Sequence, residues 1–233
     1  MTGFARACAL LAAAILAGCS SDGSQDREIN ALAVGGSAVL QTLQTGRPAK
    51  DAAKIRVEVT PALLAATPGA VLEVVPERLG LQDFLQRIEI RRDVTPGVVE
   101  VWKSSDDAHV ILRDGVLVAT KGFGGDLRSG EARTAVAGFD GEGGGGARLL
   151  VIDRLDGSAQ NVHFSCEMVQ LGRQDVTIAG QQIPTRRIRE NCHYRDFSFT
   201  NDYWVEIGSG QLHQSRQWAG PHIGYLKLRR LKG

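Results

Sequence analysis

The stretch AHVILRDGVLVAT, residues 108–120, decides the fold. Asp114-Gly115 stands between two largely apolar, alternating runs. A two-residue hairpin turn needs a positive φ at both central positions, and Asp and Gly both tolerate that conformation. The stretch therefore predicts a β-hairpin with antiparallel strands over residues 108–113 and 116–120.

Further short runs lie on both sides of this hairpin, and turn residues separate them about every ten positions. The additional expected strands are residues 70–75, 84–91, 98–102, 149–154, 161–171, 176–178, 182–190, 197–207 and 223–231. Several of them alternate charged and apolar side chains, as strands do when one face meets water. We therefore expect a mainly β fold, a curved antiparallel meander sheet that resembles half a barrel.

One or two short helices are expected before the strands. Over residues 27–43 the apolar side chains partly follow helical spacing, with an interruption at Gly35-Gly36. Thr60-Pro61 combines a capping residue with a first-turn proline and predicts a short helix that ends at Thr67.

The glycine-rich stretch GFDGEGGGG, residues 138–146, predicts a flexible loop. It divides the strands into a front group and a back group. We interpret residues 27–233 as a single domain that contains this loop, and a division into two units at the loop is the alternative.

The N-terminus has the order of a bacterial lipoprotein signal. Arg6 precedes a short apolar run, which ends in Leu16-Ala17-Gly18-Cys19 and is followed by polar residues. The run is too short to span a bilayer core, which needs about 20 apolar residues. We expect residues 1–18 to be removed, Cys19 to be acylated, and residues 19–26 to form a tether. The alternative is an ordinary signal peptide or a weak anchor, with Cys19 incidental.

Removal of residues 1–18 would leave 215 residues with 26 basic and 26 acidic side chains. A neutral chain argues against nucleic acid as a partner, because that binding needs an electropositive face. No later stretch is apolar enough to span a membrane. The predicted contact with the membrane is therefore the lipid on Cys19, and stable anchoring needs more than one acyl chain.

Cys166 and Cys192 are the pair that remains in the exported part of the chain. In an oxidising compartment such a pair predicts a disulfide. Free thiols are one alternative. The other is half of a metal site with His163 and His193, although zinc ligands usually come in pairs such as C-x₂-C.

No recognised catalytic or cofactor motif stands out. The glycines of residues 122–125 lack the spacing of a phosphate-binding loop, so a sharp turn is expected there. The five histidines show no i, i+4 pairing that would build a metal site. We therefore expect no catalytic residues, no metal and no cofactor.

The C-terminal part is rich in aromatic and hydrogen-bonding side chains. Candidate contacts to a glycan or a partner are Tyr203, Trp204, Arg216, Gln217 and Trp218. Rings offer flat faces to sugars and Arg and Gln offer donors to hydroxyl groups, but the same residues are also explained by packing of a sheet. The basic run of residues 227–231 suggests a solvated strand edge or, alternatively, a contact to anionic lipid or polysaccharide.

Three stretches together resemble one known family. Residues 110–127, residues 201–205 and residues 210–221 are similar to the hairpin and the two later motifs of the YjbF/GfcB (YmcC-like) lipoproteins. The resemblance implies a largely β outer-membrane lipoprotein associated with export or assembly of extracellular polysaccharide and group 4 capsule. It implies no catalytic residues, and it does not account for the cysteine pair or for the glycine-rich loop.

The expected function is that of a non-enzymatic, lipid-anchored protein on the periplasmic side of the outer membrane. It would assist export or assembly of a capsular or extracellular polysaccharide. The expected partners are other polysaccharide-export proteins and, as a second expectation, the polysaccharide itself. Two alternatives are a module that carries a lipid or a lipoprotein, and an enzyme that modifies polysaccharide. Ser20 after the cysteine, rather than Asp, favours sorting to the outer membrane.

Overall fold

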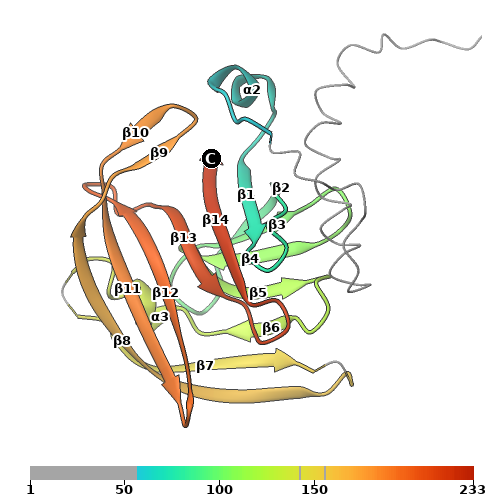
Figure 1. The fold of residues 1–233 in the computed structure, drawn as a ribbon, viewed down its shortest axis with the longest axis vertical. Helices are drawn as coiled ribbons and strands as arrows, with labels where there is room; N and C mark the ends of the chain where they lie inside the picture. The colour runs from blue at the N-terminus through green and yellow to red at the C-terminus, as the bar shows by residue number, and fades with distance from the viewer. Residues whose placement is uncertain (1–56, 142, 155) are drawn as a thin grey trace, which may run out of the picture.

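The computed structural model describes residues 57–141, 143–154 and 156–233 (Figure 1). The expected signal peptide, Cys19, the tether at 19–26 and the expected helix at 27–43 all lie outside these residues. Among the described residues, no helix is both long enough and apolar enough to cross a membrane.

Strands make up more than half of the described residues, and two short helices accompany them. In chain order the elements are α2 (Pro61–Ala66), β1 (Val71–Pro76), β2 (Asp83–Arg91), β3 (Val99–Lys103), β4 (His109–Arg113), β5 (Val116–Lys121), β6 (Leu127–Gly130), α3 (Arg133–Val136), β7 (Gly145–Asp153), β8 (Ala159–Arg173), β9 (Val176–Ile178), β10 (Gln181–Ile183), β11 (Thr185–Tyr194), β12 (Phe197–Glu206), β13 (Leu212–Trp218) and β14 (Tyr225–Lys232). The mainly β prediction is confirmed.

Twelve strands form one antiparallel sheet in the order β5-β4-β3-β2-β1-β14-β13-β12-β11-β8-β7-β6, and β9 pairs only with β10. Two meanders therefore run outward from the centre, where β1 pairs with β14. Figure 1 shows the sheet curving until it is nearly closed like a barrel, with α2 and the β9–β10 hairpin outside its ladder. The predicted curved meander is confirmed.

A glycine-rich turn joins β5 and β6, the two strands at opposite ends of the sheet order. The Asp126 carboxylate accepts hydrogen bonds from the backbone N–H groups of Gly122 (3.0 Å) and Phe123 (3.2 Å). Thr120 donates its hydroxyl proton to Asp126 at 2.7 Å and accepts the N–H of Leu127 at 3.0 Å. The predicted sharp turn is confirmed, and it brings the two sheet ends together.

The two most specific local predictions are also confirmed. β4 and β5 pair around Asp114-Gly115, whose φ values are 48° and 84°. In α2 the Thr60 hydroxyl accepts the N–H of Leu63 at 3.2 Å, and Pro61 occupies the first turn. These capping and turn signals depend on neighbouring residues alone, so they do not require knowledge of the tertiary fold.

Three apolar clusters stabilise the sheet. The largest fills the concave side and contains edge-to-face and stacked rings, such as Phe164 with Phe199 at 4.9 Å between centroids. A smaller cluster around Tyr203 lies near α3. The third joins Trp204 and Phe84 to Leu64 of α2 and Ile178 of β9, so the two elements outside the ladder cover that part of the sheet.

Several boundaries differ from the sequence expectation. β6, α3 and β13 were not predicted, and the glycine-rich loop is shorter than expected because β7 begins at Gly145. Residues 182–190 are not one strand, because Pro184 separates β10 from β11. Proline has no N–H to donate to a ladder, which explains the break.

The predicted strand edge at residues 227–231 is wrong, because β14 lies between β1 and β13 in the middle of the sheet. Its basic side chains diverge. Lys227 and Arg229 point to the convex face, where they pair with Glu77 and Glu73. Arg230 instead donates to Glu100 of β3 at 3.0 Å, across the curve of the sheet.

Candidate functional site

Alternation along β12 and β13 divides the polar and aromatic residues of the two sequence motifs between the two faces of the sheet. Asn201, Tyr203 and Gln217 are at most 1% exposed and take part in a buried hydrogen-bond network on the concave side. Asp202 and Arg216 point to the convex side. We call the concave group the inner network and the convex group the outer band.

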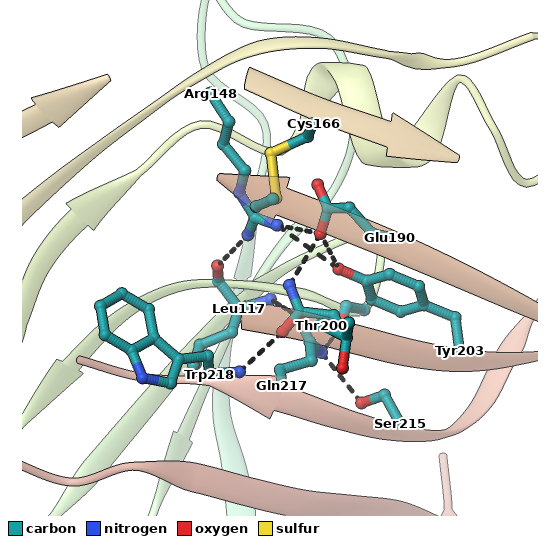
Figure 2. A network of polar contacts seen from close by, with 12 residues as sticks. Leu117, Arg148, Cys166, Glu190, Thr200, Tyr203, Ser215, Gln217 and Trp218 are labelled. Atoms are coloured by element: carbon teal, nitrogen blue, oxygen red, sulfur yellow. Dashed lines mark hydrogen bonds and ion pairs between the residues drawn. A yellow bond between two sulfur atoms is a disulfide. The ribbon is translucent and has the colours of Figure 1, made fainter. Parts of the chain in front are cut away.

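The inner network centres on Glu190 of β11 (Figure 2). Its Oε2 accepts hydrogen bonds from Arg148, from Asn201 Nδ2 (2.7 Å) and from the hydroxyl of Tyr203 (2.8 Å). Burial raises the pKa of Tyr203, and the Glu190 charge raises it further. Burial acts to lower the pKa of Arg148, but Glu190 and Tyr203 together outweigh it and the pKa is raised. The arginine therefore stays charged beside Glu190.

The same network satisfies the backbone of β5. The Gln217 side chain accepts the N–H of Leu117 at 2.8 Å and donates to the carbonyl of Gly115 at 2.9 Å. Arg148 donates to the Leu117 carbonyl at 3.3 Å (Figure 2). β5 ends the sheet order, so its outer backbone groups meet side chains instead of a further strand. The network therefore joins β5 to β7 and β13 across the concave side of the sheet.

Cys166 and Cys192 lie directly opposite each other on β8 and β11 and form a disulfide, which confirms the prediction. The two sulfurs and a Glu190 oxygen, all buried, lie within 4.8 Å of one another. Among the described residues, this is the one group of three or more potential metal ligands. Sulfurs bonded to each other are not thiolate ligands. His163 and His193 are exposed. The structure therefore excludes both the free-thiol and the metal alternatives.

The outer band consists of two neighbouring rows of side chains that run across the strands. In the first row the strand register aligns Arg189, Asp202, Arg216 and Lys227. In the second row it aligns Arg187, Trp204, Gln214, Arg229 and Glu73. Neighbouring strands lie about 4.8 Å apart, so the residues of each row lie side by side across the sheet.

Asp202 joins the two rows. It accepts two hydrogen bonds from Arg189 (2.9 and 3.2 Å) and two from Arg187 (3.2 and 3.0 Å). Burial acts to raise the pKa of Asp202, but the two guanidinium groups outweigh it and hold the pKa below its ordinary value. Arg187 also lies over the Trp204 ring, 5.1 Å from its centroid. One ionised carboxylate therefore serves two cations.

Glu77 repeats this arrangement at the other end of the first row. It accepts two hydrogen bonds from Arg216 (2.8 and 2.7 Å) and contacts Lys227 at 3.4 Å. The hydrogen bonds from Arg216 lower its pKa. With Arg229 bound to Glu73, the outer band holds five cations against three carboxylates, a surplus of two positive charges.

The five candidate contact residues do not form a common surface. Tyr203 and Gln217 are 0% exposed, Trp218 is 8% exposed and Trp204 is 9% exposed. Arg216 reaches solvent, although it is bound to Glu77 and lies 3.4 Å from the centroid of the Tyr225 ring. A buried ring has no free face on which a sugar could stack. The four buried residues are therefore explained by packing within the sheet.

Two pockets are relevant to the alternative of a lipid-carrying module. The one on the concave side, between Leu72, Leu112, Leu212 and Leu228, has a volume of about 10 Å³. That is room for about one water molecule. A larger pocket of about 440 Å³ lies between α2, the β9–β10 hairpin and the end of β14, with both apolar and charged side chains in its wall. Apolar side chains of the largest cluster line the concave side.

Sequence reasoning missed Arg148, Arg187, Arg189 and Glu190 as functional or structural centres. For three of them a signal exists in residues 185–191 (TRRIREN), where charged side chains alternate with Ile188. A strand that places Ile188 in the core must also place Glu190 there, and Arg187 and Arg189 on the other face. Arg148 follows the glycine-rich stretch and has no such signal.

Comparison with known proteins gives one family and one fold. The family model described as "Group 4 capsule polysaccharide lipoprotein gfcB, YjbF" matches residues 42–231. Among curated proteins, none matches the chain. The crystal structure of the hypothetical lipoprotein YmcC from Escherichia coli (K12) has the same fold, with a TM-score of 0.62 and 19% identity over 92% of this chain and 98% of that chain.

Proposed function

The chain belongs to the YjbF family of group 4 capsule polysaccharide lipoproteins, and from this premise we propose that it is a non-enzymatic accessory of polysaccharide export or assembly. It would act on the periplasmic side of the outer membrane, anchored by lipid on Cys19, together with other export proteins. The match over residues 42–231 carries this proposal.

The state of the acids supports a role without catalysis. Glycosidases need one carboxylic acid with a raised pKa and a second carboxylate across an accessible cleft. In the outer band, arginines hold the pKa values of Asp202 and Glu77 below the ordinary range. Burial raises the pKa of Asp83 to about 7, but its side chain is 5% exposed and forms no part of the pockets described above. Such an acid has no access to a polymer.

Deletion of the gene is the direct test. We expect less polysaccharide at the cell surface, with unchanged amounts of the polymer's sugar precursors inside the cell. Expression of the wild-type chain should restore the surface polymer. Unchanged surface polysaccharide would contradict the proposal, and accumulation of shortened or altered polymer would favour an enzyme.

The anchor has a separate test. A Cys19→Ala variant should lose incorporation of labelled fatty acid and accumulate as the uncleaved precursor, because the thiol is the acylated group. Cys8→Ala is the matched control, because Cys8 lies inside the expected signal. Retained labelling of Cys19→Ala would exclude Cys19 as the lipid site.

A further inference from the structure

We propose that the outer band binds an acidic polysaccharide, through its surplus of cations rather than through stacked rings. This rests on the proposed function for the class of polymer, and it adds the site and the chemistry of the ligand. Four strands, β11 to β14, supply the surface, and two rows of side chains cross it.

The first observation is charge that the protein itself leaves uncompensated. Asp202 is shared by two arginines, and Glu77 is shared by Arg216 and Lys227. In each group one positive charge is therefore in excess. Guanidinium groups match carboxylates with two parallel hydrogen bonds, so acidic sugars or acidic substituents on sugars are suitable ligands.

The second observation is access. The side chains of Arg187, Arg189, Arg216 and Arg229 are 26%, 36%, 29% and 33% exposed, and that of Lys227 is 57% exposed. Their stems are held by the sheet and their ion pairs, while the charged ends reach water. Fixed cations lose less conformational entropy when a ligand binds than free surface lysines do.

The third observation is the spacing. Residues two apart on a strand are about 7 Å apart, and Arg189 and Arg216, on alternate strands of one row, are about 10 Å apart. The cations thus recur over a band that is long in one direction, which suits an extended polymer more than a small molecule. The rings on which a neutral sugar would stack, those of Trp204 and Trp218, are 9% and 8% exposed.

The test compares two double variants of the full mature chain. Arg189→Gln with Lys227→Gln removes two charges from the outer band, while Arg187 still pairs with Asp202 and Arg216 still pairs with Glu77. Arg128→Gln with Arg133→Gln is the control, since these arginines are 54% and 72% exposed and lie on β6 and α3, away from the band. Both variants change the net charge equally.

Binding is measured by affinity electrophoresis in native gels that contain alginate, a polyuronate, or neutral dextran. We expect alginate to retard the wild type and the control at low salt, and the band variant to bind alginate about tenfold more weakly, a change worth about 1.4 kcal/mol. Dextran should retard none of them, and salt should abolish the retardation by alginate, because screening weakens contacts between exposed charges.

Other results would overturn the inference. Equal weakening in both double variants would show an effect of net charge alone. Equal retardation by dextran would remove the selectivity for acidic polymers. Binding to phosphatidylglycerol vesicles without binding to alginate would assign the band to a membrane surface. If the purified chain binds alginate as expected but deletion of the gene leaves surface polysaccharide unchanged, the binding site stands and the proposed function is refuted. If the chain does not bind alginate but deletion reduces surface polysaccharide, the proposed function stands and the binding site is refuted.

Discussion

Glu190 and Asp202 are carboxylates in adjacent positions of the β11–β12 ladder, yet they face opposite sides of the sheet. Glu190 is 0% exposed, and its arginine partner is 3% exposed. Asp202 is also nearly covered, but its two arginine partners are 26% and 36% exposed. In the inner network each charge has a single buried counter-ion. In the outer band water also solvates the charged groups, so cations can exceed carboxylates and remain available to a ligand.

The largest loss of unfolding free energy is expected from substitution of Glu190. Glu190→Ala leaves the Arg148 charge buried without its counter-ion, a loss that costs about 3–5 kcal/mol of unfolding free energy. Asp202→Ala leaves two arginines that water can solvate, so we expect a loss of about 1 kcal/mol or less. Urea denaturation followed by tryptophan fluorescence measures both.

Glu190→Gln is the control that separates charge from hydrogen bonding, since the amide oxygen can still accept but carries no charge. We expect it to fall between the wild type and Glu190→Ala. Equal losses in Glu190→Ala and Asp202→Ala would contradict the division into a buried network and a solvated band.

The second prediction concerns the disulfide that lies against Glu190. Replacing both Cys166 and Cys192 by Ala releases a loop closed over 26 positions. The entropy of the unfolded chain then rises, which corresponds to a loss of about 3–4 kcal/mol in the chain-entropy estimate. Reductant should have a comparable effect on the wild type and none on the double variant. A double variant as stable as the oxidised wild type would show that the sheet alone fixes these two strands.

The parts of the fold that depend on neighbouring residues could be predicted from the sequence. The Asp114-Gly115 hairpin, the Thr60 cap and the turn at residues 122–125 each have a local chemical cause. The pairing of β1 with β14 has none, because it joins residues about 150 positions apart, and no short-range pattern specifies such a contact. The alternating charges of β14 therefore suggest an edge strand, although β14 lies at the centre of the sheet.

The site was predictable only in part, and for the same reason. Alternation correctly separates Tyr203 from Trp204, but it does not tell which of the two faces is covered by other elements. Trp204 is buried because α2 and the β9–β10 hairpin, from distant parts of the chain, pack over the convex face. The outer band exists because β11, β13 and β14 align their arginines in register, which becomes visible only when the order of the strands is known.

The smallest expected effect is on the pH dependence of stability, and it concerns Asp202 of the outer band. Because Arg187 and Arg189 outweigh the effect of burial, the pKa of Asp202 in the folded chain lies below the ordinary value of 3.8. The ionised form therefore adds stability that is fully present above the ordinary pKa and is lost as the pH falls through the folded pKa. Asp202→Asn cannot titrate there.

We therefore expect the melting temperature of the wild type to exceed that of Asp202→Asn near neutral pH, and the difference to shrink steadily on acidification below the ordinary pKa of an aspartate. Glu77 also has a lowered pKa and remains in both chains, so both curves should fall in acid, the wild type more steeply. Parallel curves would mean that the two arginines are equally well solvated without the carboxylate. Asp202→Asn also raises the surplus on the outer band from two positive charges to three, so alginate should bind this variant more tightly than the wild type.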